Sequence, residues 1–187
     1  MRTFEHVAPN VWKKLSEIQR TDWVRRGIEN PETVVEHILA LIKLAHEFKG
    51  LSDAERKELS EMLEIHDWPE SIHGDEILLT HEDIYESRAK TKFEKELAAM
   101  ATLCKSLGQD GEIILSLWLR FETSKDEIAS IARQLDKYQA VEKALEYEQG
   151  QKIAVFKEFL EYSRKFITHP VLVERLGKLE DTWRQAQ

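Results

Sequence analysis

Hydrophobic residues recur at intervals of three and four along most of the chain, which is the spacing of one face of an α-helix. Residues 31–48 give the clearest example, with an apolar face formed by Val34, Ile38, Leu41, Ala45 and Phe48. The alternation of apolar and polar residues that marks a half-buried strand is found in no segment. The pattern therefore predicts an all-α protein.

Helix start and stop signals divide this pattern into separate elements. Asn30 followed by Pro31 predicts a helix start, because Asn caps a helix and Pro fits its first position. Ser52 and Ser124 are each followed three residues later by Glu, which is the capping-box pattern. With residues 21–29 left irregular, we expect helices over residues 11–20, 31–48, 52–67, 81–107, 112–122, 124–149, 151–168 and 170–184.

The length of 187 residues suits one well-cored domain. A hydrophobic content of 42%, with five Trp and seven Phe, argues for a packed core rather than disorder. Seven Gly and four Pro leave few places at which a helix must break. We therefore expect a single all-α domain over residues 1–187, with its core at about 15–180 and roughly six to eight helices.

Charge and cysteine content restrict the partners and the compartment. The net charge of −8 and the pI of about 5.5 argue against a generic nucleic-acid or membrane surface. The longest apolar run, residues 113–119, is too short to cross a bilayer, and residues 1–15 lack the apolar stretch of a signal peptide. The single cysteine, Cys104, excludes an intramolecular disulfide, suits a core position and fits a cytoplasmic protein.

Residues 64–76, which read Glu-Ile-His-Asp-Trp-Pro-Glu-Ser-Ile-His-Gly-Asp-Glu, hold the richest candidate chemistry. Pro69 disfavours continuation of a helix, so His66 and Asp67 should lie where a helix ends. Gly74 permits a tight turn that would bring the following carboxylate back toward them. We interpret the stretch as part of a divalent-metal site, with four candidate side chains: His66, Asp67, Glu70 and Asp75.

Two residues elsewhere in the chain could complete such a site. His37 lies on or beside an apolar helix face, and Asp136 lies among alanines, where an unpaired carboxylate would be costly. Each has a plainer interpretation when taken alone: His37 as a core histidine, and Asp136 as a surface partner of Lys137 or Arg133. Two imidazoles and two carboxylates together favour one divalent transition metal (Mn²⁺, Co²⁺, Fe²⁺, Ni²⁺ or Zn²⁺) over Ca²⁺ or an all-thiolate zinc site.

The order of these residues resembles the His…His-Asp…Asp pattern of the HD-domain metal-dependent phosphohydrolases. The closer resemblance is to their 5′-nucleotidase branch, the deoxyribonucleoside 5′-monophosphatases, and it extends from residue 15 to about residue 179. The matching pieces are Thr-Asp-Trp-Val-Arg-Arg (21–26), Pro-Glu-Thr-Val-Val-Glu-His (31–37), His-Asp-Trp-Pro-Glu (66–70), Gly-Asp (74–75), Leu-Trp-Leu-Arg-Phe-Glu (117–122) and Gln-Leu-Asp-Lys (134–137). Each piece alone is weak, but together and in this order they are specific for a fold and a metal site.

The resemblance implies a helical HD domain with one metal ion held by His37, His66, Asp67 and Asp136. It also implies that Glu70 and Asp75 stand beside the metal as proton-transfer or water-orienting groups, and that Trp23 shapes a sugar pocket. In some members an Arg directly precedes the matching Trp, whereas this chain has Asp22. Phosphate binding would then fall to another basic residue, Arg20, Arg25 or Arg26, unless the substrate differs.

We therefore expect a metal-dependent 5′-nucleotidase that releases phosphate from (deoxy)ribonucleoside 5′-monophosphates by attack of water, with Glu70 or Asp75 protonating the leaving oxygen. Two alternatives stay open: an HD hydrolase of nucleotide polyphosphates or cyclic nucleotides, and a non-catalytic HD-fold binding module. A second metal at His73 and His81 is less favoured than two ordinary loop histidines. The apolar segment 113–121 and the C-terminal helices could form a dimer surface, so we expect a homodimer.

Overall fold

The computed structural model of the chain describes residues 4–77 and 85–186, and only the backbone at 85–87. Its helices are α1 (Pro9–Leu15), α2 (Thr21–Arg25), α3 (Val34–His46), α4 (Asp53–Ile65), α5 (Glu70–His73), α6 (Tyr85–Lys105), α7 (Gly108–Thr123), α8 (Glu127–Gln151), α9 (Phe156–Ser163) and α10 (Pro170–Gln185). The described residues form no strand, and an isolated antiparallel bridge joins Gln19 to Thr33. The predicted all-α fold is confirmed.

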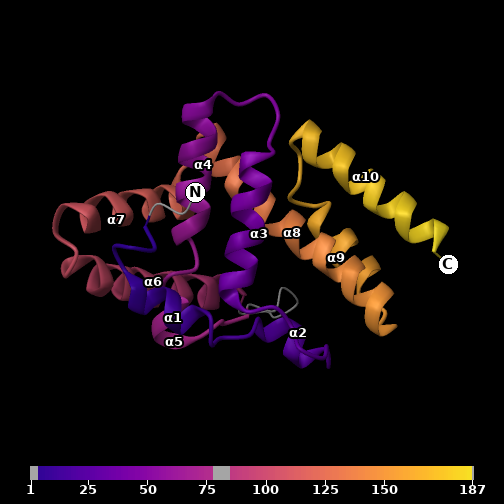
Figure 1. Cartoon of the computed structure of the whole chain (residues 1–187), viewed down its shortest axis with the longest axis horizontal. Helices are drawn as coiled ribbons and strands as arrows, with labels where there is room; N and C mark the ends of the chain where they lie inside the picture. Colours follow the sequence, from indigo (N-terminus) through magenta and orange to yellow (C-terminus); the bar gives the residue numbers. More distant parts are fainter. Residues whose placement is uncertain (1–3, 78–84, 187) are drawn as a thin grey trace.

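Helix α8 is the axis of the bundle. It contacts α3, α4, α7, α9 and α10, and Figure 1 shows it running behind the α3–α4 pair. Helices α6 and α7 pack against each other toward one end of the long axis, whereas α9 and α10 pack against α8 toward the other end (Figure 1). Residues near the middle of α8 therefore lie close to α3 and α4.

Two apolar clusters form the core. The first surrounds α8 and includes Leu41, Phe48, Leu63, Leu135 and Phe156. The second lies among α1, α3, α6 and α7 and includes Trp12, Val34, Ile38, Met100 and Trp118. It also contains Cys104, which is buried as predicted. Helix α3 supplies residues to both clusters, so a polar residue on α3 can lie at the boundary between them.

Two helices begin at caps other than the predicted ones. Thr33 caps α3 in a capping box with Glu36, whereas the predicted cap Asn30 lies outside the helix with a φ of 49°. Asp126 caps α8 by accepting a hydrogen bond from the backbone N–H of Ala129 at 3.0 Å. In both cases a better-placed oxygen closer to the first turn satisfies the free N–H groups.

Other predicted boundaries also shift. The capping box that begins at Ser52 is confirmed at the start of α4. Residues 21–25, expected to be irregular, form α2, and of residues 151–168 only Phe156–Ser163 form a separate helix. Helix α7 starts at Gly108 rather than at residue 112. The predicted helix start at His81 lies outside the described residues.

The segment between α1 and α2 is extended, because it pairs with the segment that precedes α3. The Arg20 N–H donates to the Glu32 carbonyl oxygen at 3.0 Å, and the Val34 N–H donates to the Ile18 carbonyl oxygen at 2.9 Å. The predicted helix over residues 11–20 therefore ends at Leu15. This pairing places Arg20 and the start of α2 directly beside the start of α3.

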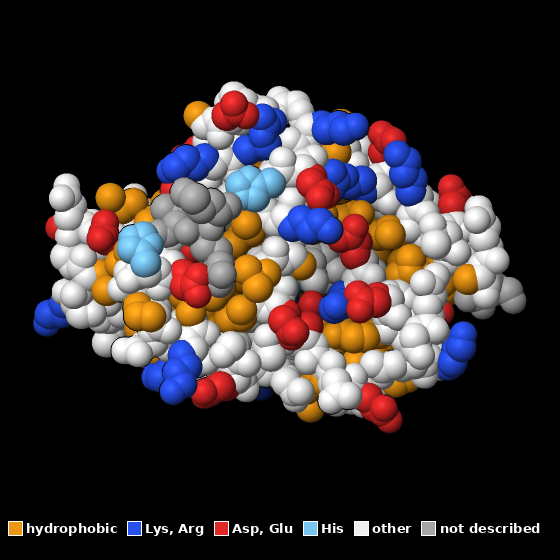
Figure 2. Space-filling view, in the orientation of Figure 1, with side chains coloured by type: hydrophobic (Ala, Val, Ile, Leu, Met, Phe, Trp, Pro, Cys, Tyr) orange, Lys and Arg blue, Asp and Glu red, His pale blue; other side chains and the backbone are white. Residues whose placement is uncertain are grey.

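None of the helices in the described part of the chain is long and apolar enough to cross a membrane. Figure 2 shows acidic and basic side chains interspersed over the visible face of the molecule. On this face, the excess of acidic residues is therefore not gathered into one patch.

Candidate metal centre

The imidazoles of His37 and His66 meet inside the protein. His37 comes from α3 and is fully buried, and His66 follows the last residue of α4 and is 5% exposed. Their ring centroids lie 5.5 Å apart. His66 lies at the boundary of the two clusters, because it follows Ile65 of the second cluster and its ring contacts Phe121 of the first at 5.1 Å.

Each imidazole uses Nδ1 for a hydrogen bond to a carbonyl oxygen. His37 Nδ1 lies 2.8 Å from the side-chain oxygen of Gln139, and His66 Nδ1 lies 2.8 Å from the backbone oxygen of Leu63. A carbonyl oxygen only accepts, so Nδ1 carries a proton in both rings, and in the neutral form of each ring the lone pair is on Nε2. Neither Nε2 atom, although buried, makes a hydrogen bond within the described part of the protein.

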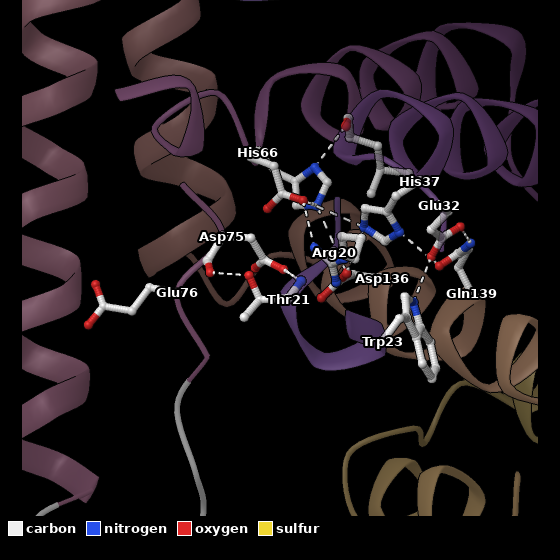
Figure 3. A network of polar contacts seen from close by, with 12 residues as sticks. Arg20, Thr21, Trp23, Glu32, His37, His66, Asp75, Glu76, Asp136 and Gln139 are labelled. Carbon is white, nitrogen blue, oxygen red and sulfur yellow. Dashed lines mark hydrogen bonds and ion pairs between the residues drawn. The ribbon is translucent and has the colours of Figure 1, made fainter. Parts of the chain in front are cut away.

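Two carboxylates approach the same pair of Nε2 atoms, and Figure 3 labels one of them, Asp136, beside His37 and His66. Asp67 Oδ2 lies 3.6 Å from His37 Nε2 and 3.2 Å from His66 Nε2. Asp136 Oδ1, from the middle of α8, lies 3.2 Å and 3.9 Å from the same atoms. Ligand atoms of His37, His66 and Asp67 all lie within 4.8 Å of one another, so these three residues could hold a metal ion. Two buried nitrogens that make no hydrogen bond with the described residues, and two adjoining carboxylates, fit such an ion chemically.

Charges in the centre compensate one another. Burial lowers the pKa of the His66 imidazole, but Asp67 and Asp136 outweigh burial and raise this pKa to about 9. Burial likewise raises the pKa of Asp67, and His66 and Arg20 outweigh it, so that pKa falls below its usual range. The side chains are therefore arranged to accommodate a positive charge between them, whether it is a proton or a metal cation.

A cavity of about 490 Å³ opens onto this centre. Besides Asp67 and Asp136, its wall is formed by Arg20, Asp22, Trp23, Arg26, Glu70, Asp75, Glu76, Ile77, Lys92, Lys137, Ala140, Glu158, Phe159, Glu161, Tyr162 and Lys165. One end is thus acidic and rich in ligand atoms, and the other is aromatic and mixed in charge. This combination suits a small ligand that carries both a phosphate and an apolar ring.

The carboxylates of Glu70 and Asp75 both line the cavity but differ in environment. Glu70 is 3% exposed, and its Oε2 has no hydrogen-bond partner among the described residues. Burial and the negative charges of Asp67 and Asp75 raise the pKa of Glu70 well above its usual value. Asp75 accepts a hydrogen bond from the Thr21 N–H at 2.6 Å. Gly74 makes the expected turn between them, with a φ of 79°.

The three predicted phosphate-binding arginines occupy different places. Arg20 lines the cavity and lies 3.2 Å from Asp67 Oδ2. Arg26 also lines it, but its guanidinium is held by Glu158, in two bonds of 2.8 Å, and by Asp22 at 3.1 Å. The third, Arg25, is solvent-exposed and is not among the residues of the cavity wall.

Lys137 is a cavity cation that the sequence pattern does not identify, because the pattern indicates only a surface partner for Asp136. The structure places its ammonium group 5.3 Å from the centre of the Phe166 ring and its side chain in the cavity wall. The adjacency of Lys137 to a proposed ligand on the same helix was the available signal.

Trp23 lies in the aromatic wall of the cavity and is 2% exposed. Its ring stacks on Phe159 with centroids 4.5 Å apart and meets Tyr147 edge-on at 5.2 Å. Its indole N–H donates to Glu32 Oε1 at 3.1 Å. Glu32 and Gln139 are two polar residues of the site that the sequence alone did not single out, although Gln139 lies three positions after Asp136 on the same side of α8.

A smaller cavity of about 220 Å³ also borders the centre. Besides residues of the centre, its wall includes three ionisable residues, Lys92, Glu96 and Glu122. Burial, followed by the charge of Glu96, raises the pKa of Glu122 to about 7. His73 is exposed and belongs to neither cavity wall, and the second histidine of the alternative two-metal arrangement, His81, lies outside the described residues.

Fold and centre together define a class of proteins. A helical bundle in which a buried histidine meets a His-Asp pair and a distant aspartate is the arrangement expected of an HD domain. The sequence profile of the HD domain family matches residues 12–172, and the chain belongs to this family.

Within this family, the chain is similar in sequence to several individual proteins. The chain is 29% identical over 179 residues to the 5′-deoxynucleotidase HDDC2 of Dictyostelium discoideum, covering 89% of this chain and 92% of the relative. It is 29% identical over 169 residues to the 5′-deoxynucleotidase HDDC2 of Mus musculus, covering 89% and 82%. The 5′-deoxynucleotidase hdd1 of Schizosaccharomyces pombe is 26% identical over 166 residues, covering 85% and 80%.

Solved structures support the fold. A conserved hypothetical protein from Pyrococcus furiosus matches with a TM-score of 0.68 at 23% identity, over 91% of this chain and 96% of that one. A protein from Pyrococcus horikoshii matches with the same TM-score of 0.68 at 18% identity, over 90% and 94%. At these identities the comparison shows a shared helical architecture.

Proposed function

We propose that the protein is a metal-dependent 5′-nucleotidase, which releases phosphate from (deoxy)ribonucleoside 5′-monophosphates. The observation that carries the proposal is the pair of buried Nε2 atoms, on His37 and His66, that face two carboxylates and lack hydrogen bonds within the described part of the chain. The adjoining cavity has room for a nucleotide and combines basic and aromatic side chains. The relatives named 5′-deoxynucleotidases support the same substrate class.

One divalent transition metal would be held by four side chains: His37, His66, Asp67 and Asp136. A set of two nitrogens and two oxygens suits Mn²⁺, Co²⁺, Fe²⁺, Ni²⁺ or Zn²⁺. When bound, such an ion polarises a phosphate oxygen and makes a bound water a usable nucleophile near neutral pH.

The remaining residues would position the phosphate and move a proton. Arg20 and Lys137 line the cavity and would bind the phosphate oxygens, because Arg26 is already held by two carboxylates. Asp75, fixed by the Thr21 N–H, would orient the attacking water. The oxygen of that water forms a bond to phosphorus as the bond from phosphorus to the 5′ oxygen of the sugar breaks.

Glu70 is the proposed general acid. Burial and its acidic neighbours raise its pKa, so its carboxyl group holds a proton at a higher pH than an exposed glutamate would. It would give this proton to the 5′ oxygen, which leaves as the hydroxyl of a nucleoside, and the products are a nucleoside and inorganic phosphate. The aromatic wall around Trp23 would receive the sugar and the base.

The expected homodimer and the expected cytoplasmic location are part of the proposal. They rest on the apolar surface of α7, where Ile113 is 48% exposed, and on the single cysteine of the chain. Sedimentation of the purified protein would distinguish a dimer from a monomer.

Release of inorganic phosphate from a panel of nucleotides tests the proposed reaction. The metal-loaded protein should release phosphate from nucleoside 5′-monophosphates and from their deoxy forms. Cleavage of only polyphosphates or cyclic nucleotides would replace the proposal with the alternative HD hydrolase. No cleavage of any nucleotide by a metal-loaded, folded protein would favour the binding module.

A further inference from the structure

A chain of buried hydrogen bonds leads from His37 to the aromatic wall of the cavity (Figure 3). His37 Nδ1 lies 2.8 Å from Gln139 Oε1, and the Gln139 amide N–H donates to Glu32 Oε2 at 3.0 Å. Glu32 Oε1 in turn accepts from the indole N–H of Trp23 at 3.1 Å. The exposed fraction of each of these four residues is 5% or less. Because these four side chains are buried, leaving any of their donors or acceptors unpaired would cost free energy.

The carboxylate of Glu32 fixes the direction of every bond in the chain. A carboxylate only accepts hydrogen bonds, so the NH₂ group of Gln139 must face Glu32. The Gln139 carbonyl oxygen must then face His37. Since that oxygen also only accepts, the His37 proton is on Nδ1 and its Nε2 lone pair points into the centre.

The backbone and carboxylate groups of Glu32 all take part in hydrogen bonds. Its backbone N–H donates to the Tyr147 hydroxyl oxygen at 2.7 Å, and its backbone carbonyl oxygen accepts from the Arg20 N–H at 3.0 Å. Both carboxylate oxygens are used, one by Trp23 and one by Gln139. A residue whose hydrogen-bonding groups are all engaged, and which is almost fully buried, can fix the orientation of its neighbours.

We propose that Glu32 and Gln139 are positioning residues that hold His37 in the metal-binding tautomer and connect this ligand to Trp23 in the cavity wall. The inference rests on the proposed function, because it takes His37 to be a metal ligand. Neither residue touches the metal or the substrate. Hydrogen-bond partners behind a metal-binding histidine commonly change metal affinity by about 10- to 100-fold.

Glu32→Gln is the most informative single substitution. The new amide at position 32 can keep its oxygen toward Trp23, but its NH₂ group then faces the NH₂ group of Gln139. Gln139 must turn over to remain paired, which points its NH₂ group at His37 Nδ1 and favours the proton on Nε2. Metal binding must reverse this arrangement, so we expect the affinity for Mn²⁺ or Co²⁺ to fall by about 10- to 100-fold.

The exchange variant Glu32→Gln/Gln139→Glu should reverse the loss. The amide now at position 32 accepts from Trp23 and donates to the carboxylate now at position 139. That carboxylate in turn accepts from the Nδ1–H of His37, so every pairing is satisfied and the net charge is unchanged. The affinity of the exchange variant for Mn²⁺ should therefore return to that of the wild-type protein, which two independent losses would not do.

Two residues elsewhere in the protein provide a matched control for each substitution. Glu148 also accepts from an indole N–H, that of Trp183 at 2.7 Å, and it lines neither cavity. Gln134 is a second buried glutamine on α8, it accepts from the Thr168 N–H at 2.8 Å, and it lines neither cavity. Glu148→Gln and Gln134→Glu should leave Mn²⁺ affinity unchanged.

The measurements are Mn²⁺ and Co²⁺ affinity by calorimetry and, in the Zn²⁺-loaded protein, the ¹⁵N–¹H signal of His37. The wild-type protein should show an exchange-protected proton on Nδ1. The inference is overturned if that proton is absent, if Glu32→Gln binds Mn²⁺ like Glu148→Gln, or if the folded exchange variant binds no better than Glu32→Gln. If the single variant does not fold, the exchange variant alone carries the test.

The metal-binding measurements distinguish a failure of the positioning role from a failure of the proposed function. A wild-type protein that binds no Mn²⁺ or Co²⁺ would refute the metal site itself. A wild-type protein that binds metal, with an affinity insensitive to the state of Glu32 and Gln139, would refute only the positioning role.

Discussion

At the scale of single residues, the properties of the centre follow from which buried polar atoms have a hydrogen-bond partner and which have none among the described residues. The Nδ1 atoms of His37 and His66 are satisfied by carbonyl oxygens, and their Nε2 atoms have no hydrogen-bond partner among the described residues. Glu70 is buried beside Asp67 and Asp75, which favours its protonated form. The two carboxyl groups that the sequence could not separate, those of Glu70 and Asp75, thus have different proposed roles.

We predict that Glu70→Gln lowers kcat by about 10²- to 10⁴-fold without changing metal content, because it removes the proposed proton donor but no ligand. Steady-state phosphate release and metal analysis of the same preparation measure both quantities. Glu142→Gln is the matched control, since Glu142 also has a pKa raised by burial and lines neither cavity. Loss of the metal in Glu70→Gln would make Glu70 a ligand instead.

Glu122 gives a prediction about pH and stability. Its pKa rises on folding from 4.5 to about 7, so folding favours the protonated acid. The destabilising effect is absent below 4.5, grows as the pH rises toward 7 and is complete above it. In the metal-free protein, Glu122→Gln should therefore increase the free energy of unfolding by about 1–3 kcal/mol at pH 8. Urea unfolding at acidic and alkaline pH measures this, and an equal effect at both would refute it.

The sequence could identify the proposed ligands because each combines an unusual residue type with a recognisable place, such as His66-Asp67 before Pro69. It could not identify Glu32, Gln139 or Lys137. Their importance depends on which side chains lie across from them, and partners more than 100 positions apart, such as Glu32 and Gln139, leave no periodic signal. The choice among Arg20, Arg25 and Arg26 stayed open for the same reason, because a run of arginines does not reveal which one faces inward.

At the scale of elements, helix periodicity predicted most helices, and local competition decided their ends. Two nearby oxygens could cap α8, and Asp126 does so while also pairing with Arg120 at 2.7 Å. The extended pairing of residues 18–20 with 32–34 is a contact between segments, so the helical pattern of residues 11–20 gave no indication of it. That pairing brings Arg20 to the centre and Trp23 to the wall of the adjoining cavity.

The contact between α6 and α7 depends on a glycine. A Cβ atom at Gly111 would lie 2.0 Å from the carbonyl oxygen of Cys104, whereas one at Gly177 in α10 would meet no atom of the described residues within 4 Å. We predict that Gly111→Ala destabilises the protein by about 1–3 kcal/mol, because the two helices must separate.

Gly177→Ala is the opposite case and serves as the control. It should stabilise the protein by about 0.5–1 kcal/mol, because Ala favours the helical conformation and nothing obstructs its methyl group. Urea unfolding of both variants measures the difference, and equal effects would contradict the close approach of α6 and α7.

At the scale of the whole molecule, the proposed ligands come from α3, from the end of α4 and from the middle of α8. These elements belong to both apolar clusters, so an ion at the centre would join the two halves of the core. Ligand binding to the folded state alone stabilises it by mass action.

We predict that Mn²⁺ at about 100 times its dissociation constant stabilises the wild-type protein by about 2.7 kcal/mol. For a chain of this length, the melting temperature should rise by about 5–10 °C. Differential scanning calorimetry with and without Mn²⁺ measures the shift, and Asp136→Ala should abolish it. A similar rise in Asp136→Ala would place the ion elsewhere.

The most direct test is a titration of the chelator-treated protein with Mn²⁺ or Co²⁺ while phosphate release from a deoxyribonucleoside 5′-monophosphate is followed. We expect no release without metal and a rise that reaches its plateau at one ion per chain. Full activity in the chelated protein, or no release at any metal concentration, would contradict the proposed metal-dependent reaction.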